Sequence, residues 1–214
     1  MSSRRFATRT LTGDNSQVLA EFDAPPADPV GLFGEWFDFA VAYPCVEPGA
    51  FTLGLADDEG RPSTRTLLTK DWDERGLLFV TTAGPTKGPG LRVGHPAAAT
   101  YYWHEIVRQI QLKGTIEPAP PEESDALFAE RPRAARAAAV TSHQTEPLDD
   151  EGAFNARVAE LEASDDELVR PVRWSGFRLV PHTIEFWQGG TSRLHRRLLY
   201  TRTADGWQPS RLQP

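Results

Sequence analysis

Residues 51–82 read FTLGLADDEGRPSTRTLLTKDWDERGLLFVTT. Three apolar or β-branched runs, at 51–56, 64–70 and 77–82, are separated by two polar turns that each end in glycine. These connections are too short for helical crossovers, so we expect the three runs to pair as antiparallel strands. Two more strands are expected at 97–103 and 107–117. Closely spaced short strands of this kind are typical of a barrel or a strongly coiled sheet.

Helical sequence lies on both sides of this strand block. Asp28 is a good N-cap and Pro29 suits the first helical position, and apolar residues then recur at helical spacing as far as Pro44. Further helices are expected within 120–161, and strands return at 177–180, 184–188 and 198–201. The sequence therefore predicts a single α+β domain over 28–214. Residues 1–27, polar and rich in proline at their end, are expected to form an arm that is mobile or docks elsewhere.

Composition excludes several classes of protein. The 214 residues include 23 Lys and Arg against 30 Asp and Glu, a formal net charge of −7, which disfavours nucleic-acid binding. The single cysteine, Cys45, can form neither an internal disulfide nor a cysteine metal cluster. No run approaches the roughly 18 apolar residues of a membrane span, and no apolar run follows the basic N-terminus. A soluble cytoplasmic protein with neither membrane nor nucleic-acid partners is expected.

Common metal and nucleotide motifs are missing from the sequence. No two of the five histidines stand three or four residues apart, and there is no HExxH arrangement, so no metal site is expected. The glycine-rich run 84–90 lacks the Walker spacing, and no GxGxxG follows a strand.

Cationic side chains recur instead in separate β segments. Arg65 and Lys70 flank one strand and point to opposite faces if the strand is regular, so a shared anion would require a long ligand or a bulge. Lys87 lies in a glycine-rich loop whose backbone N–H groups could also bind an anion. The run 193–197, Arg-Leu-His-Arg-Arg, places three cationic or titratable side chains on one face. A solvated charged edge explains any one run more simply, and their recurrence favours an anion site.

Several stretches resemble the pyridoxamine 5'-phosphate oxidase family, in order from about residue 28 to the C-terminus. They are RTLLTK (65–70), TKG (86–88), RQ (108–109), RP (131–132), QT (144–145), IEFWQG (184–189), RLHRR (193–197) and RLQP (211–214). EFWQG followed by RLHxR is highly specific. The resemblance implies an α+β fold, a split antiparallel β-barrel with flanking helices. It also implies a homodimer with two FMN sites at the subunit interface.

The resemblance assigns residues to cofactor and substrate position by position. The implied FMN contacts are Arg65, Thr66, Leu67, Leu68, Lys70, Thr81, Lys87, Gln109, Gln144, Thr145, Trp187 and Arg197. Cations in this set suit the FMN phosphate, and amides and Arg197 suit the polar edge of the flavin ring. The implied substrate contacts are Lys70, Arg131, Arg193 and His195, of which Arg193 and His195 are also the implied catalytic pair.

Three positions depart from the vitamin B6 enzymes of the family, which hold the substrate phosphate with a lysine, a tyrosine, an arginine and a serine. Leu127 stands in the tyrosine place, Ala135 in the serine place, and Thr86 replaces a flavin-loop arginine. Loss of two hydroxyl donors weakens binding of a phosphorylated substrate.

Other stretches resemble the FMN oxidases of phenazine biosynthesis, which oxidise reduced, nitrogen-containing tricyclic carboxylic acids. They are TLTG (10–13), PPADP (25–29), SHQTEPL (142–148) and the RLQP ending. We therefore expect an FMN-dependent oxidase of secondary metabolism that acts on a CH–NH or CH–NH2 donor, with dioxygen as acceptor. Lys70 suits the vitamin enzyme better, so pyridoxine/pyridoxamine 5'-phosphate oxidase stays open. A flavin- or deazaflavin-binding protein without turnover is the third alternative.

Overall fold

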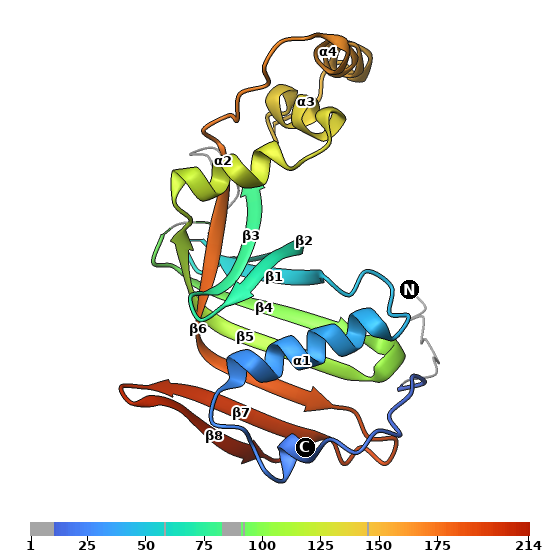
Figure 1. The fold of residues 1–214 in the computed structure, drawn as a ribbon, viewed down its shortest axis with the longest axis vertical. Coiled ribbons are helices and arrows are strands. Elements are labelled where there is room, and N and C mark those ends of the chain that lie inside the picture. The colour runs from blue at the N-terminus through green and yellow to red at the C-terminus, as the bar shows by residue number, and fades with distance from the viewer. Residues whose placement is uncertain (1–10, 58, 83–90, 92, 145) are drawn as a thin grey trace, which may run out of the picture. The chain divides into compact units, whose positions relative to one another are not determined.

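The structure, a computed structural model, describes residues 11–57, 59–82, 91, 93–144 and 146–214 (Figure 1). Its helices are α1 (Pro29–Ala42), α2 (Pro121–Ala129), α3 (Arg133–Thr141) and α4 (Glu151–Ala163), with short 3-10 turns η1 (Ala20–Phe22) and η2 (His104–Ile106). Its strands are β1 (Ala50–Ala56), β2 (Pro62–Asp73), β3 (Gly76–Thr82), β4 (Pro96–Trp103), β5 (Arg108–Pro118), β6 (Trp174–Gln188), β7 (Arg196–Thr203) and β8 (Gly206–Leu212).

The strands form one sheet in the order β3-β2-β1-β4-β5-β6-β7-β8, and β3 also pairs with β6. The extra pairing closes β1 to β6 into a six-stranded antiparallel barrel, from which β7 and β8 continue. The predicted α+β split barrel with flanking helices is therefore confirmed. Pro181 interrupts neither half of β6, because it lies between the part that pairs with β3 (174–179) and the part that pairs with β7 (183–188).

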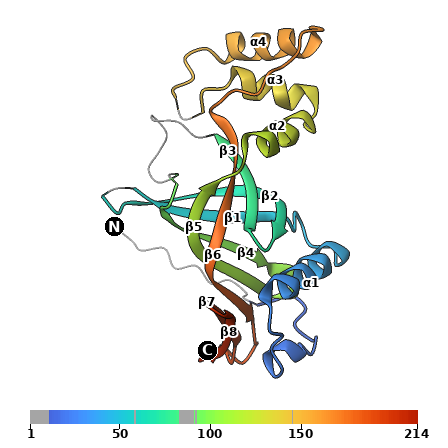
Figure 2. The same ribbon diagram turned by 60° about the vertical axis from the view of Figure 1, so that its left-hand side comes forward.

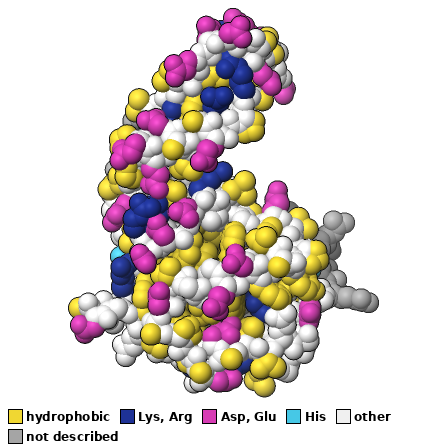
Figure 3. All heavy atoms as spheres, in the orientation of Figure 1, with side chains coloured by type: hydrophobic (Ala, Val, Ile, Leu, Met, Phe, Trp, Pro, Cys, Tyr) yellow, Lys and Arg dark blue, Asp and Glu magenta, His cyan; other side chains and the backbone are white. Residues whose placement is uncertain are grey.

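The chain divides into two compact units, one comprising residues 1–52, 98–114 and 181–214 and the other residues 53–97 and 115–180. We refer to them as unit 1 and unit 2. The single domain expected over 28–214 stays a prediction. Within the described residues, no helix is long and apolar enough to cross a membrane. On the face shown in Figure 3, acidic side chains are spread among basic ones, so the net charge of −7 is not gathered in one patch there.

Unit 1 has an aromatic core beneath α1. The Asp28 side chain accepts the Val30 N–H at 3.0 Å, as the predicted N-cap requires. The apolar face of the helix is buried, and the centroids of the Trp36 and Phe186 rings lie 5.1 Å apart in an edge-to-face arrangement. The described part of the arm packs on the same unit, where Asn15 Nδ2 donates to the Gly189 carbonyl at 3.2 Å.

Unit 2 contains α2, α3 and α4, and in both ribbon views α3 lies between the other two (Figures 1 and 2). Arginines complete the ends of two of these helices. Arg133 donates to carbonyls at the end of α4, including that of Leu161 at 3.0 Å. Arg173 donates to the Ser142 carbonyl at 3.0 Å at the end of α3. Cations suit this position, because the last carbonyls of a helix have no partner within the helix.

Candidate active site

Unit 2 contains a pocket of about 460 Å³, within the range of about 300–1,000 Å³ that is usual for small-molecule sites. Strands β2 and β3, helix α3 and the residues beside that helix surround it. The lining residues are Thr66, Leu67, Leu68, Lys70, Val80, Thr81, Thr82, Arg131, Ala135, Ala138, Ala139, Ser142, Gln144 and Trp174.

The pocket brings together much of the site that the sequence predicts. The implied substrate contact Arg131 lines it. So do six of the implied FMN contacts, which are Thr66, Leu67, Leu68, Lys70, Thr81 and Gln144. Thr86, Lys87 and Thr145 lie outside the described residues, so the assignments of Lys87 and Thr145 remain predictions.

The charge of the pocket is positive. Its described lining includes Lys70 and Arg131 and no Asp or Glu. The Arg131 guanidinium lies 5.2 Å from the centroid of the Trp174 ring, and its Nη1 is buried without a partner among the described residues. Burial lowers the pKa of Arg131 from its ordinary value. A half-buried cation whose buried N–H has no partner among the described residues is costly, so this arrangement suits an anionic ligand.

Strand β2 presents Lys70 to the pocket but not Arg65. Thr69 pairs with Phe79 and Asp71 with Leu78, so Lys70 is the extra residue of a β-bulge. Arg65 is not among the lining residues, and its Nη2 lies 3.4 Å from Ser63 Oγ. Within the described lining, Lys70 and Arg65 therefore do not meet at one anion site, and the assignment of Arg65 to FMN stays a prediction.

The neutral part of the pocket suits a flat ring with polar edges. Hydroxyl and amide groups come from Thr66, Thr81 and Gln144, and each can donate and accept. Small side chains at Ala135 and Ala138 form the opposing wall on α3. These groups fit the ring of FMN, which is planar and carries mixed donors and acceptors at its edges.

The remaining predicted residues lie in unit 1, on β5, β6, β7 and the turn between the last two. They are Gln109, Trp187, Arg193, His195 and Arg197. The Trp187 and His195 rings are 4.9 Å apart, centroid to centroid. His195 Nδ1 accepts the Gly190 N–H at 3.1 Å, so in neutral His195 the proton lies on Nε2, which is then a donor.

Two site residues were missed from the sequence. Gly190 is required because a Cβ there would lie 2.7 Å from the Leu194 carbonyl oxygen, so a side chain would distort the turn that carries His195. Glu185 accepts two hydrogen bonds from Arg197. The side-chain alternation of β6 and β7 could have indicated this pair, because it places both on one face near each other.

No group of three or more His, Cys, Asp or Glu side chains within the described ranges could hold a metal ion.

Comparisons with known proteins identify the family of the chain. Residues 41–165 match the family described as "Pyridoxamine 5'-phosphate oxidase", and residues 174–214 match the "Pyridoxine 5'-phosphate oxidase C-terminal dimerisation region". A pyridoxine/pyridoxamine 5'-phosphate oxidase from Rubrobacter xylanophilus is 44% identical over 198 residues, which cover 92% of this chain and 91% of that protein.

Solved structures extend the comparison to the fold. PhzG from Burkholderia lata, in complex with tetrahydrophenazine-1-carboxylic acid, matches with a TM-score of 0.89 and 37% identity over 94% of this chain and 100% of that chain. A pyridoxamine 5'-phosphate oxidase-related, FMN-binding protein from Nostoc punctiforme matches the fold, with a TM-score of 0.69 and 18% identity over 88% and 99% of the two chains. The matched dimerisation region fits the expected dimer. By sequence and by fold, the chain belongs to the pyridoxamine 5'-phosphate oxidase family, whose members bind flavin.

Proposed function

We propose that the protein is an FMN-dependent oxidase that dehydrogenates an anionic, reduced nitrogen heterocycle or amine, a phenazine-type precursor, and passes the electrons to dioxygen. The observation that carries this proposal is the pocket of unit 2, in which Lys70 and Arg131 stand among hydroxyls, an amide and small side chains, with no Asp or Glu in the described lining. A cytoplasmic location belongs to the same proposal.

FMN, when bound, supplies hydride-acceptor chemistry at a carbon beside nitrogen and its own reoxidation by dioxygen. The chain supplies binding and orientation. Thr66, Thr81 and Gln144 hydrogen-bond the cofactor, while Arg131 pairs with the substrate anion. The His195 Nε2–H orients the substrate nitrogen and can exchange a proton with it.

A second copy of the chain completes each site in this proposal. Arg193, His195 and Arg197 lie within the matched dimerisation region, residues 174–214, whereas Lys70 and Arg131 lie outside it. The residues proposed for one ligand thus lie partly inside and partly outside the dimerisation region. This division supports a flavin site at the interface of two copies.

The phosphate-binding hydroxyls of the vitamin enzymes are missing here. Ala135 lines the pocket where those enzymes have a serine. Leu127, in the tyrosine place, is not a lining residue, and its Cδ1 would lie 3.6 Å from a Cβ at Gly176. A carboxylate needs fewer donors than a phosphate, so these changes favour a carboxylate-bearing heterocycle. The ligand named for PhzG belongs to this class.

Pyridoxine/pyridoxamine 5'-phosphate oxidase is the second candidate. Two cations, Lys70 and Arg131, match a phosphate that carries about −1.5 to −2 charges near neutral pH. Charge-assisted hydrogen bonds are roughly twice as strong as neutral ones, so loss of two hydroxyls weakens phosphate binding without abolishing it. The name of the Rubrobacter relative supports the same activity.

Turnover with two substrates distinguishes the candidates. The purified protein is expected to show a flavin absorbance spectrum and to consume oxygen with a higher kcat/KM for a dihydrophenazine carboxylate than for pyridoxine 5'-phosphate. The variant Leu127→Tyr/Ala135→Ser should raise kcat/KM for the phosphate substrate by about tenfold, since it restores two hydroxyl donors. A wild-type preference for pyridoxine 5'-phosphate would establish the second candidate instead. A yellow protein that oxidises neither substrate would indicate flavin binding without turnover.

A further inference from the structure

Alternate residues of β6 contact α2 and the segment that follows it. Trp174, Gly176 and Arg178 share one face of the strand, because side chains alternate along it. We call these three residues the β6 row. At one end of the row, the Phe128 ring meets the Trp174 ring edge to face at 5.3 Å, and the Arg131 guanidinium lies over the same ring. The orientation of Arg131 thus depends on where α2 lies against β6.

Gly176, in the middle of the row, lets helix and strand approach closely. Its N–H donates to Ser124 Oγ at 3.0 Å, and its carbonyl accepts the Ala119 N–H at 3.0 Å. A Cβ at Gly176 would lie only 3.0 Å from the Ala119 Cβ. The helix is therefore held close to the strand at this point.

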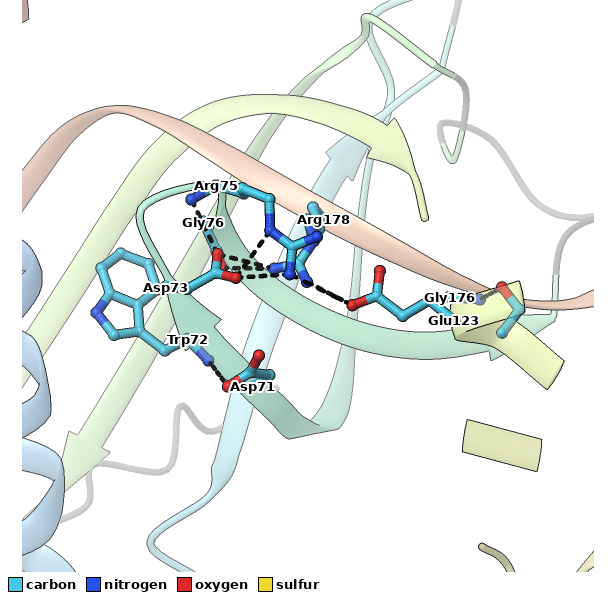
Figure 4. Close-up of polar contacts among 9 residues, drawn as sticks. Asp71, Trp72, Asp73, Arg75, Gly76, Glu123, Gly176 and Arg178 are labelled. Atoms are coloured by element: carbon cyan, nitrogen blue, oxygen red, sulfur yellow. Dashed lines mark hydrogen bonds and ion pairs between the residues drawn. The ribbon is translucent and has the colours of Figure 1, made fainter. Parts of the chain in front are cut away.

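Arg178, at the other end of the row, contacts the first turn of α2 (Figure 4). Its side chain is 5% exposed, and its Nη2 donates to Glu123 Oε1 at 2.6 Å. Its Nη1 donates to Asp73 Oδ1 at 3.1 Å and to the Gly76 carbonyl at 3.3 Å. Arg75 pairs with the same two carboxylates, at 2.7 Å for Asp73 and 3.5 Å for Glu123. These contacts join the start of α2 to the turn between β2 and β3.

The cluster is an inefficient source of stability. Arg178 Nε and Glu123 Oε2 are buried and have no hydrogen-bond partner among the described residues. Buried ion pairs carry a large desolvation cost, and incomplete hydrogen bonding adds to it. A role in positioning α2 against β6 explains why charged side chains are buried in this cluster.

We propose that Arg178 is a positioning residue for Arg131: by binding Glu123 it sets where α2 lies along β6, and so where Arg131 meets an anionic ligand. Arg131 lies two residues beyond the end of α2, and at about 1.5 Å per residue the helix carries a displacement over roughly 9 Å from Glu123 to Ala129. This inference rests on the proposed function, in which Arg131 contacts the substrate anion.

Inorganic phosphate tests the anion contact directly, as an inhibitor competing with substrate in the FMN-loaded protein. Arg131→Ala should weaken phosphate inhibition. Arg178→Met and Glu123→Gln, which both remove the ion pair, should raise the inhibition constant and KM about tenfold with kcat within about twofold, since small misplacements affect binding strongly. Arg178→Met added to Arg131→Ala should not weaken phosphate inhibition further, because the effects of substitutions at coupled residues are not additive.

A matched control is Arg61→Met, which removes the ion pairs of the exposed Arg61 side chain with Asp57 and Glu59 in the turn between β1 and β2 and should change neither constant. Additive effects of Arg178→Met and Arg131→Ala would overturn the positioning role. If Arg178→Met does not fold, the Glu123→Gln protein decides, and unchanged phosphate inhibition there would equally overturn it. If Arg131→Ala itself leaves phosphate inhibition unchanged, the anion contact of the proposed function fails as well.

Discussion

Glu185 binds the Arg197 guanidinium through two hydrogen bonds, at 2.7 Å from Nε and 3.0 Å from Nη2. The Arg197 Nη1 also donates to the Gln213 carbonyl at 3.2 Å, so three of its five N–H groups are engaged in described contacts. The hydrogen bond and charge of Glu185 raise the pKa of Arg197. The Arg197 guanidinium is therefore already oriented, and its charge is balanced by a carboxylate, before any ligand binds.

Glu185→Gln should raise the reduction potential of bound FMN. Removing the carboxylate charge leaves Arg197 with a net positive charge, which favours the more electron-rich reduced flavin. A positive shift of about 30 mV corresponds to a tenfold change in a two-electron equilibrium. Titration against a redox dye measures it, with the exposed Glu160→Gln as control. An unchanged potential in a variant that retains FMN would separate this ion pair from the flavin environment.

Arg197→Ala should weaken FMN retention. Loss of a charge-assisted hydrogen bond costs about 1.5–3 kcal/mol, which corresponds to an increase in Kd of roughly 10- to 100-fold. Flavin fluorescence during titration of the apoprotein gives the Kd. Arg202→Ala is the matched control on the same strand, since Arg202 lies over the Trp207 ring. Flavin content equal to that of wild type would remove Arg197 from the site.

Gly190→Ala should lower the free energy of unfolding by about 1–3 kcal/mol, because the new Cβ meets the Leu194 carbonyl in the turn before His195. Gly34→Ala, in α1 with nothing within 4 Å of its Cβ position, should instead raise it by about 0.5–1 kcal/mol. Chemical denaturation of the FMN-loaded proteins measures both. A change in the free energy of unfolding that has the same sign for both substitutions would contradict the close approach inferred for Gly190.

Asp73 should contribute stability that is lost in acid. Burial raises the pKa of Asp73, but hydrogen bonds from Arg75 and the charges of Arg178 and Arg75 outweigh it, so the pKa stays below its ordinary value of 3.8. A carboxyl whose pKa is lower in the native than in the unfolded state stabilises the fold at pH values above the unfolded pKa. This stabilisation is lost as pH falls through the native pKa.

In Asp73→Asn, the fall in unfolding free energy below about pH 4 should therefore be shallower than in wild type. Denaturant unfolding between pH 3 and pH 7 measures the slope. The variant Glu160→Gln, at an exposed position of α4, is the control for loss of a carboxylate. Parallel slopes for Asp73→Asn and wild type would show that this carboxyl does not titrate abnormally.

Much of the fold could be predicted from short patterns. Alternation and β-branched residues indicated the strands of the barrel, and Asp28 with Pro29 located the start of α1. Strand β8 was missed, although Asp205-Gly206 is a strong hairpin signal before it, because most of its side chains are exposed and show no alternation. The identity of the family followed from specific motifs such as EFWQG at 185–189.

The sequence alone determined the types of element, the family and the residue types of the site, because side-chain period and turn chemistry depend on a few consecutive residues. Only the tertiary structure decided that Lys70 lies in a bulge beside Arg131 while Arg65 does not line the pocket. It also decided that Glu185 binds Arg197 and that Arg178 joins α2 to β6. These contacts depend on register and packing between distant segments, which are set by the burial of the whole chain.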